Sequence, residues 1–320
     1  MYKFAIWSFS NHFQNKVLPS IRNNKKIEIK YILTKKKNSN LDLKNLKWLK
    51  NKNELKLKKD IDFIYISSIN ANHFKNIKFA LSNKINVICE KPICLKTSQF
   101  KELIRISKAK KVKFFEMIQY MHHPVFLKLK KIINKNFIGK IKIVESEFKI
   151  PIKKTKNNFR FKKELGGGAL IDSGFYPLSV MFTLFNSEKI KVIKNELKNE
   201  NKLDIKGNLF AKNENQVFFK LGWGFKSLYK NYVKIKGTKG EIEVKFFFSK
   251  QVIQGAEIKV NTSKEKIIKV KKANQINLAF NNYLQSSTSD FKYKLDLSFK
   301  IMKIMEILRK DKFKLNFYQI

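Results

Sequence analysis

The sequence predicts an α/β protein of two domains: a doubly wound parallel sheet in residues 1–120, then an α+β domain with an open, mainly antiparallel sheet in residues 121–320. Three observations support this fold class. The chain of 320 residues exceeds the roughly 100 to 200 residues of a usual single domain. Its first part alternates short β-rich runs with amphipathic stretches, which indicates βαβ units. Its second part has longer runs of alternating apolar and polar residues, which are typical of an antiparallel sheet with one solvated face.

The first domain is predicted to consist of short apolar strands separated by helices. The strands cover residues 3–7, 27–33, 63–67, 87–89 and 112–116. The helices cover residues 13–23, 72–83 and 98–109. In such sheets, ligands bind beyond the carboxyl ends of the strands. The residues expected at those ends, and therefore near a site, are Ser8, Thr34, Ser67 and Glu90.

The second domain is predicted to be rich in strands. These cover residues 140–151, 190–197, 204–211, 216–223, 229–236 and 241–248. Residues 237–240, with the sequence GTKG, predict a hairpin turn between the last two of these strands. Helices are predicted for residues 169–184 and 297–308.

The charge of the chain is unusual but does not predict a nucleic-acid partner. The formal net charge is +44, and 65 of the 69 basic residues are lysines. Recognition of base edges favours the planar fork of arginine, and these lysines are dispersed along the chain. We interpret them as a solvated surface that speeds the approach of anionic ligands. A nucleic-acid-binding protein driven by charge remains an alternative.

No membrane segment, secretion signal or metal framework is predicted. The longest apolar runs, such as residues 4–7 and 63–66, fall far short of the ~20 residues that span a bilayer. The N-terminus lacks the apolar stretch and cleavage site of a signal peptide. Cys89 and Cys94 are interpreted as free thiols in a reducing compartment, and no zinc pattern is present. We therefore expect a cytoplasmic protein.

The turn after the first strand is where a dinucleotide-binding domain needs glycines, because backbone amides must approach the pyrophosphate there. Here the turn runs from Ser8 through Ser10 and Asn11 to Phe13, and all three expected glycines are absent. Serine is the least damaging replacement, being small and able to donate a hydrogen bond. Taken alone, the turn argues against tight binding of a dinucleotide.

The second predicted strand ends in Thr34 and Lys35, where NAD-binding proteins commonly carry an acidic residue for the ribose 2′-hydroxyl. A hydroxyl followed by a cation suits a 2′-phosphate instead. We therefore expect NADP as the cofactor, with NAD as the alternative.

Two clusters carry candidate chemistry. Lys91 follows the strand 87–89 and could hydrogen-bond a substrate hydroxyl, although such a lysine is often only part of a surface turn. Asp172 and Tyr176 follow a run of three glycines and, on a helix, would share one face. A capping Asp beside a core Tyr is the structural alternative. Functionally, the phenol would exchange a proton with a substrate oxygen, helped by a neighbouring ammonium.

In combination, the ordered motifs resemble the Gfo/Idh/MocA oxidoreductases over nearly the whole chain. The residues that carry the resemblance are 62–66, Asn70, His73, Glu90-Lys91-Pro92, Glu116, 120–124, 138–139, Arg160-Phe161, the GGGALIDSGFYPL block and 237–240. The resemblance implies a Rossmann domain, an open-faced sheet and a nicotinamide cofactor. It also implies sugars or cyclitols as substrates and a homodimer or homotetramer built on the open face of the sheet.

The resemblance also assigns roles to individual residues. It implies that Lys91, Asp172 and Tyr176 are catalytic. Tyr176 stands where many members of the family carry His. In having Tyr at this position, the chain resembles the branch of glucose-fructose oxidoreductase and dimeric dihydrodiol dehydrogenase. The substrate would meet Lys91, Arg160, Asp172 and Tyr176, with residues 148–163 and the surroundings of Trp223 also expected to contact it. The expected cofactor-binding residues are Ser8, Ser10, Asn11, Thr34, Lys35, Ser67, Asn70, His73, Glu90 and Lys91.

The chain departs from the family pattern at Ser8, Ser10 and Phe13, and also at Ile69 and Met121, where proline and arginine are frequent. The sequence nevertheless predicts an NAD(P)-dependent oxidoreductase. Such an enzyme transfers a hydride between the cofactor and a hydroxyl or carbonyl of a sugar, nucleotide sugar or related diol. The alternative is a non-catalytic ligand-binding relative with weakened cofactor affinity.

Overall fold

The computed structural model describes residues 1–35, 46–155, 158–309 and 317–320. These residues form two compact units. The first unit comprises residues 1–118 and 276–298, and the second comprises residues 119–275 and 299–320. The long helix α8 (Thr288–Leu308) contributes its first half to one unit and its second half to the other.

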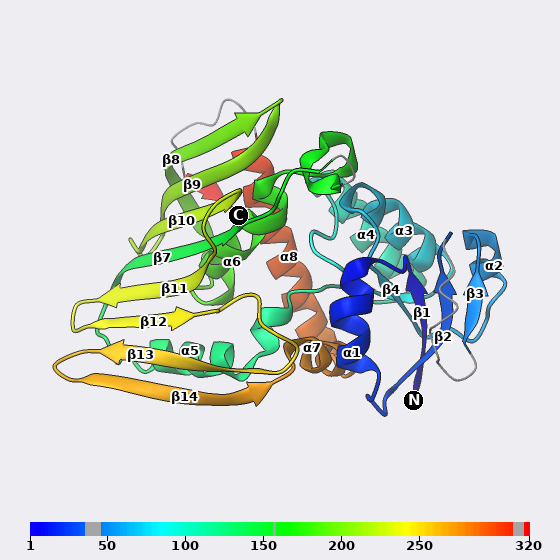
Figure 1. Ribbon diagram of the computed structural model, residues 1–320, viewed down its shortest axis with the longest axis horizontal. Coiled ribbons are helices and arrows are strands. Elements are labelled where there is room, and N and C mark those ends of the chain that lie inside the picture. Colours follow the sequence, from blue (N-terminus) through cyan, green and yellow to red (C-terminus); the bar gives the residue numbers. More distant parts are fainter. Residues whose placement is uncertain (36–45, 156–157, 310–316) are drawn as a thin grey trace. The chain divides into compact units, whose positions relative to one another are not determined.

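The first unit contains a parallel sheet of six strands in the order β3-β2-β1-β4-β5-β6 (Figure 1). This is the strand order of a doubly wound dinucleotide-binding sheet, so the predicted fold class is confirmed for this part of the chain. The strands are β1 (Tyr2–Trp7), β2 (Ile27–Leu33), β3 (Lys47–Leu49), β4 (Phe63–Ile66), β5 (Asn86–Cys89) and β6 (Phe114–Glu116). Strand β3 was not predicted.

Helices flank this sheet and explain why its central strands are apolar on both faces. They are η1 (Phe13–Val17), α1 (Leu18–Ile21), α2 (Lys52–Lys56), α3 (Asn70–Ser82), α4 (Thr97–Lys110), most of α7 (Gln275–Leu284) and the start of α8. Side chains of η1, α1 and α7 share one hydrophobic core with Phe4, Ile6 and Tyr65 of the strands. Helix α7 was not predicted. It comes from the C-terminal part of the sequence and contributes side chains to this core.

The topological switch point of the sheet lies between β1 and β4, because β2 lies to one side of β1 and β5 lies to the other side of β4. Ser8 follows β1 and Ser67 follows β4 at their carboxyl ends. Open α/β sheets bind their ligands at this place. The fold therefore directs the search for a site to these two turns and to the turn that follows β5.

The second unit contains a sheet of nine strands in the order β14-β13-β12-β11-β7-β10-β9-β8-β15. Strands β7 and β10 pair in parallel, and the other described pairs are antiparallel, which confirms the mainly antiparallel sheet. The strands are β7 (Ile141–Ile150), β8 (Lys189–Glu200), β9 (Leu203–Asn213), β10 (Phe218–Phe225), β11 (Lys230–Gly237), β12 (Glu241–Lys245), β13 (Gln254–Asn261), β14 (Glu265–Ala273) and β15 (Phe317–Gln319). The hairpin β13–β14 was not predicted. Strand β12 ends earlier than predicted because Phe246 adopts a φ of 51°.

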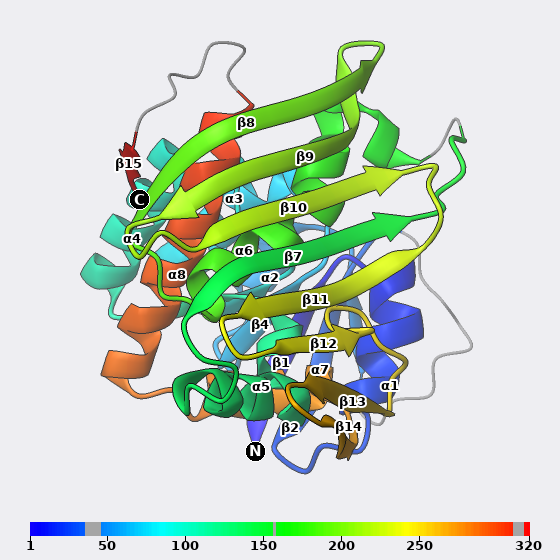
Figure 2. The same cartoon turned by 90° about the vertical axis from the view of Figure 1, so that its left-hand side faces the viewer.

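The remaining elements of the second unit are η2 (Gln119–His122), α5 (Pro124–Asn134), η3 (Phe159–Phe161), η4 (Lys163–Leu165), η5 (Leu170–Gly174) and α6 (Phe175–Thr183). The segment η5–α6 packs on β7 and β10 and is buried throughout. Figure 2 shows the opposite face of the sheet, with no described helix in front of β7, β10 and β11. The predicted helix over 169–184 is present, but its first turn is π-helical.

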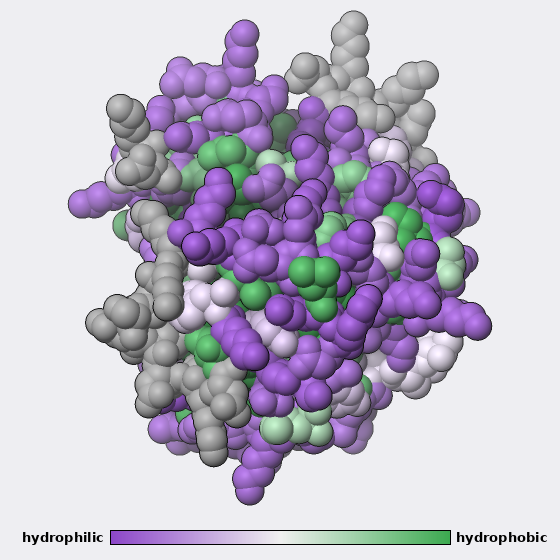
Figure 3. Space-filling model, turned by 90° about the vertical axis from the view of Figure 1, so that its right-hand side faces the viewer, coloured by the Kyte–Doolittle hydropathy of each residue, from purple (hydrophilic) through white to green (hydrophobic). Residues whose placement is uncertain are grey.

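The surface is strongly hydrophilic where Figure 3 shows it, and hydrophobic residues form only small separate patches there. No helix among the described residues combines the length and the apolar character needed to cross a bilayer. The described part of the chain also contains no group of three or more His, Cys, Asp or Glu side chains that could hold a metal ion.

Candidate functional site

The turn after β1 retains the backbone conformation of a glycine although it has lost the glycine. Ser8 has a φ of 82°, in the left-handed region that favours glycine. Its amide donates to the carbonyl of Leu33 at 2.9 Å, which ties the turn to the end of β2. Such backbone strain persists where the surrounding structure enforces it, often at functional sites.

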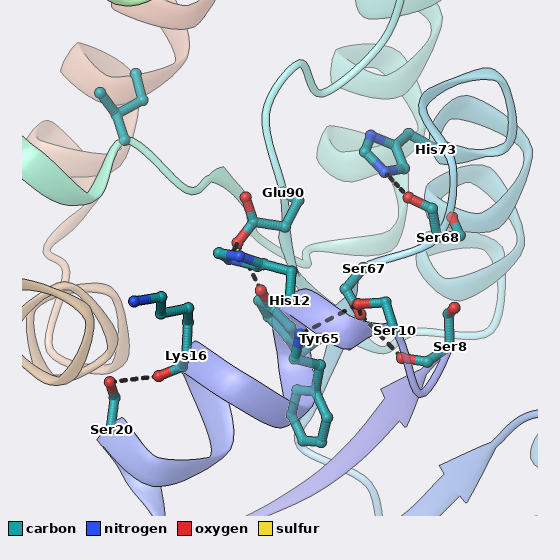
Figure 4. A network of polar contacts seen from close by, with 12 residues as sticks. Ser8, Ser10, His12, Lys16, Ser20, Tyr65, Ser67, Ser68, His73 and Glu90 are labelled. Atoms are coloured by element: carbon teal, nitrogen blue, oxygen red, sulfur yellow. Dashed lines mark hydrogen bonds and ion pairs between the residues drawn. The ribbon is translucent and has the colours of Figure 1, made fainter. Parts of the chain in front are cut away.

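Two serine side chains and one backbone amide hold this turn in place (Figure 4). The Ser67 hydroxyl donates to the carbonyl of Ser8 at 2.9 Å, and the Ser10 hydroxyl donates to Oγ of Ser67 at 3.1 Å. The amide of Phe13 donates to Oγ of Ser10 at 3.1 Å. Ser10 thus caps the start of the helix. Its side chain folds back into the turn, and one helix amide is already satisfied by the protein.

Phe13 occupies the third glycine position of the fingerprint and is completely buried. Its ring packs on Tyr65 with centroids 5.9 Å apart and on Phe9 at 5.8 Å, and Phe9 meets Trp48 edge-on at 5.4 Å. In the usual motif, glycine allows the helix to pack closely on the strand. Here aromatic packing replaces that close approach, so Phe13 belongs to the core and does not crowd the turn from outside.

The turn after β5 carries Lys91, and the residue before it, Glu90, contacts two other side chains. Figure 4 shows these contacts of Glu90. The Tyr65 hydroxyl donates to Oε1 of Glu90 at 2.6 Å, and Nε2 of His12 lies 3.2 Å from the same oxygen. Burial alone would raise the pKa of Glu90, but His12, Tyr65 and Lys91 together lower it. The ionised Glu90 therefore joins the first turn, through His12, to the residue that precedes Lys91.

His73 lies behind these turns and not on their surface. Its ring is completely buried, with Nδ1 at 2.7 Å from the carbonyl of Pro92 and Nε2 at 2.8 Å from that of Ser68. Burial lowers the pKa of His73, and a neutral imidazole can donate to only one of these carbonyls at a time. Asn70, at the start of α3, is also buried. Both residues are therefore placed to support the turns after β4 and β5.

The end of β2 presents Thr34 and Lys35. The Thr34 amide donates to the carbonyl of Leu49 at 3.1 Å, which fixes the strand end against β3, and Lys35 is exposed. Lys36 lies outside the described residues.

The conformation of the turn after β1 is compatible with a bound dinucleotide. The positive φ of Ser8 keeps the first turn open at the switch point, while the side chain of Ser10 is turned inward.

The glycine run of the second unit has a steric purpose. A Cβ on Gly167 would lie 2.5 Å from the carbonyl oxygen of Arg160, 2.6 Å from that of Phe159 and 2.7 Å from that of Lys162. The amide of Gly168 donates to the Arg160 carbonyl at 2.9 Å, and Gly168 has a φ of 118°. The glycines thus allow the segment 159–162 to lie directly against the loop.

This close approach delivers Arg160 to Asp172. Nε of Arg160 donates to Oδ2 of Asp172 at 2.5 Å, and the side chains are 36% and 11% exposed. Asp172 lies within the π-helical turn η5, and such turns are frequent at functional sites. The guanidinium remains partly accessible while it holds the buried carboxylate. The pairing was not predicted, although both residues were candidates.

Tyr176 is the second residue of α6, four residues after Asp172, and lies in an aromatic cluster. Its ring meets Phe148 at 4.7 Å and Phe248 at 5.5 Å, and the residue is 9% exposed. Trp223, expected near the substrate, is completely buried, and the absent side chains of Gly174 and Gly207 make room for its ring. Trp223 is therefore a packing residue, whereas Tyr176 keeps a small accessible surface.

Lys91 lies in the first unit, whereas Arg160, Asp172 and Tyr176 lie in the second. Within the first unit, Ser8, Ser10 and Ser67 come together, and Glu90 joins them through His12. The pairing of Lys91 with Tyr176 stays a prediction. Sequence reasoning missed His12 and Tyr65, although a phenol inside an otherwise apolar strand was a signal that a polar partner would lie nearby.

Each of the two units is similar to a known family of domains. The parallel sheet with a polar switch point and the open-faced second sheet define a two-domain protein of the dinucleotide-binding class. Residues 8–118 match the family described as "Oxidoreductase family, NAD-binding Rossmann fold", and residues 126–243 match the "GFO/IDH/MocA C-terminal domain". The chain belongs to the Gfo/Idh/MocA oxidoreductase family.

Relatives of known activity match part of the chain. Trans-1,2-dihydrobenzene-1,2-diol dehydrogenase from Xenopus laevis is 35% identical over 136 residues, which are 42% of this chain and 41% of that protein. A dTDP-3,4-didehydro-2,6-dideoxy-alpha-D-glucose 3-reductase from Actinomadura kijaniata is 26% identical over 185 residues, 57% of this chain and 55% of that protein. The alignments thus span from about two fifths to little more than half of these relatives.

The fold extends over nearly the whole chain in solved structures. A 3-ketoreductase from Actinomadura kijaniata, in complex with NADP and TDP-benzene, matches with a TM-score of 0.87 at 17% identity, covering 95% of this chain and 96% of that one. An aldose-aldose oxidoreductase from Caulobacter crescentus matches with a TM-score of 0.82 at 16% identity, covering 96% of each chain. At these identities the likeness shows the fold.

Proposed function

We propose that this protein is an NADP-preferring oxidoreductase. It would transfer a hydride between the cofactor and a hydroxyl or carbonyl of a sugar, nucleotide sugar or related diol. The observation that carries the proposal is the turn after β5, where Lys91 follows a Glu90 that is held by Tyr65 and His12 at the carboxyl end of the sheet. Residues 1–120 would bind the dinucleotide, and residues 121–320 would bind the substrate.

The cofactor would be held at the switch point of the parallel sheet. Ser8, Ser10 and Asn11 would face its phosphates, and Thr34 with the exposed Lys35 would suit a 2′-phosphate. Ser67, Glu90 and Lys91 would line the nicotinamide end, with Asn70 and His73 supporting the turns from behind. When bound, the cofactor would donate or accept the hydride.

The residues of this chain would position the substrate and move its proton. Lys91 would hydrogen-bond the reacting oxygen, and Tyr176 would exchange a proton with it as general acid or base. Asp172 would hold a second hydroxyl, with Arg160 fixing the carboxylate. The partly exposed guanidinium of Arg160 would also contact the substrate.

The class of substrate is supported by the named relatives, which act on a dihydrodiol and on a dTDP-linked keto sugar. Both compounds present neighbouring oxygens on a ring. The guanidinium of Arg160 and the carboxylate of Asp172, which pair within the second unit, are groups suited to bind such adjacent oxygens.

The first experiment is a thermal-shift titration with NADP, NADPH, NAD and NADH, followed by turnover with aldoses, nucleotide sugars and ring diols. We expect the strongest stabilisation by the NADP forms. If none of the four stabilises the protein at millimolar concentration, a non-catalytic relative is favoured instead. Lys91→Ala and Tyr176→Phe should each abolish most turnover, whereas Lys96→Ala, which changes an exposed lysine after the same turn, should not. If both variants keep turnover within about twofold, the assignment is wrong.

We also propose a cytoplasmic homodimer or homotetramer that associates through the open face of the second sheet. Phe246 and Ile267 are 48% and 46% exposed near β12 and on β14. Phe246 also lines a groove of about 520 Å³ together with glutamates and lysines, a mixture that can be self-complementary. Cys89 and Cys94 are free thiols, which suits a reducing compartment. A single monomer peak in sizing chromatography would contradict the oligomer.

The proposal includes no nucleic-acid partner, because the lysines are dispersed along the chain and the arginines number only four. A filter-binding series at about physiological salt should show affinity no greater than that of a generic lysine-rich protein. Greater affinity would favour a nucleic-acid role.

A further inference from the structure

Glu116, the last residue of β6, is a buried acid that the proposed reaction does not use. It is 6% exposed. Its Oε1 accepts a hydrogen bond from the amide of Ile93 at 2.8 Å. Its Oε2 is buried and accepts no hydrogen bond from the described residues. A carboxyl with one satisfied and one unsatisfied oxygen is costly to bury when ionised, so its presence here calls for a role.

The position of Glu116 connects it to the turn that carries Lys91. Ile93 lies two residues after Lys91, so the bond to Oε1 holds the far side of that turn. The backbone of Glu116 is fixed in turn by α7, because the Tyr283 hydroxyl donates to the Glu116 carbonyl at 2.8 Å. The amide of Ile118 donates to the same phenol at 3.3 Å. Glu116 is therefore held through its carboxyl by Ile93 and through its backbone by Tyr283.

The charges around Glu116 belong to the candidate site. Glu90 and Lys91 act on it from the turn after β5, and the thiols of Cys89 and Cys94 and the phenol of Tyr283 lie in the same buried region. Burial raises the pKa of Glu116 to about 7, although the Ser298 hydroxyl, the Ile93 amide and the Lys91 charge act in the opposite direction.

We propose that Glu116 is a positioning residue for Lys91. Its carboxyl holds the Lys91–Ile93 turn through the Ile93 amide and sets the orientation and reactivity of the lysine by gaining or losing a proton beneath that turn. The inference rests on the proposed function only in taking Lys91 as the reacting lysine. Ionised Glu116 attracts the ammonium toward the turn, and protonated Glu116 releases it, so the two states present Lys91 differently to a ligand.

Two measurements test this without any turnover. Infrared spectra should show a protonated-carboxyl band that disappears as the pH rises through about 7, and Glu116→Gln should remove the band. The rate at which an amine-reactive acetylating reagent labels Lys91, followed by mass spectrometry of its peptide, should show a step over the same pH range. Glu116→Gln should abolish the step, whereas Glu102→Gln, which changes a half-buried acid on α4, should keep it.

Where turnover is found, the pH profile of kcat/KM should lose one inflection in Glu116→Gln and keep it in Glu102→Gln. If Lys91 shows the labelling step and no substrate or cofactor is found, the proposed function fails and the role of Glu116 stands. If Glu116→Gln leaves the labelling profile of Lys91 unchanged, the inference is overturned. Should that variant not fold, Glu116→Asp, which withdraws the carboxylate from Ile93, should shift the step; an unshifted step overturns the inference too.

Discussion

The two units solve the same local problem in different ways, as a comparison of their turns shows. In the first unit, the turn after β1 has lost its glycines, yet Ser8 keeps a φ of 82° and serine hydroxyls hold the backbone. In the second unit, Gly167 remains because a Cβ there would lie within 2.7 Å of three carbonyl oxygens. One turn is held by side chains, and the other is held by direct contact of backbones.

The difference shows which glycines a fold can lose. A positive φ costs a residue such as serine only about 1 to 2 kcal/mol, which neighbouring hydrogen bonds can offset. A Cβ that meets backbone atoms has no such remedy, because neither partner can move without disturbing a helix or strand. Loss of the fingerprint therefore weakens the argument for a phosphate-binding turn less than the sequence suggests. Loss of Gly167, in contrast, would separate Arg160 from Asp172.

The largest effect is expected for Gly167→Ala. The added methyl group would force the segment 159–162 away from the loop, with a loss of about 3 kcal/mol in the free energy of unfolding, measured by urea denaturation. Turnover should fall as well, because Arg160 would no longer reach Asp172. Gly224→Ala is the matched control, since its Cβ would first meet Cγ of a lysine at 3.3 Å. Equal losses in the two variants would show that backbone contact is not what holds the loop.

In the first unit, where side chains hold the turns, stability should depend on pH through a buried carboxyl. The glycine loop of the second unit, which backbone contacts hold, should show no such dependence. The folded-state pKa of Glu116 is about 7, above its ordinary 4.5, so the unfolded chain ionises first as the pH rises. Glu116 therefore costs stability that grows as the pH rises from about 4.5 to about 7. Between about pH 5 and pH 8, the wild type should lose roughly 3 kcal/mol relative to Glu116→Gln, measured by urea denaturation at each pH.

Lys250 of the second unit serves as a control, because its contribution to stability should change with pH in the opposite direction from that of Glu116. It is 8% exposed, and burial lowers its pKa from 10.5 to about 7. Above about pH 7 the unfolded chain keeps a proton that the folded chain has lost, so the cost of burying this lysine falls as the pH rises from about 7 to about 10.5. Lys250→Met should remove that gain. If both variants shifted the pH dependence in the same direction, burial would not be the cause of either pKa shift.

Much of the fold could be predicted because its physical signals are local. The apolar runs of β1, β2 and β4 and the alternation along β9 and β11 are visible in the sequence. The start of α8 was missed although a local signal was present: Ser287 Oγ accepts the amide of Asp290. The hairpin β13–β14 was missed because its lysine-rich, mostly exposed strands bury few side chains.

The candidate residues that the structure brings together in the first unit were predicted, but their contacts were not. The strand-end rule identified Ser8, Ser67 and Glu90. The contact of His12 with Glu90 depends on the path of the first turn, and the pairing of Arg160 with Asp172 depends on the glycine loop. The packing of α7 against the first sheet involves residues far apart in the sequence, for which periodicity gives no signal.

A smaller effect is expected for Arg160→Lys, which tests whether the second turn serves an ion pair of fixed geometry. The guanidinium donates through Nε to Asp172 and also lies over the ring of Phe159 at 4.9 Å. Lysine keeps the charge but loses both the planar donor and the stacking. We expect kcat/KM to fall by about tenfold with little change in unfolding free energy. Arg105→Lys, on the exposed side of α4, should be neutral. Equal turnover in both variants would show that Arg160 contributes only its charge and that its hydrogen-bond geometry does not matter.

The smallest effect is expected for Ser8→Gly. This variant tests whether the side chain of Ser8 or its backbone conformation holds the turn after β1. Glycine would relieve the strain of the φ of 82°, at the cost of a more flexible unfolded chain, for a net gain of about 0.5 kcal/mol. Affinity for NADP should rise, because the turn would lose a side chain where phosphates approach most closely. Ser98→Gly, at an exposed position of α4, should instead lose about 0.5 kcal/mol. A loss of the same size for Ser8→Gly would mean that the serine side chain, and not the backbone path inherited from glycine, holds the turn after β1.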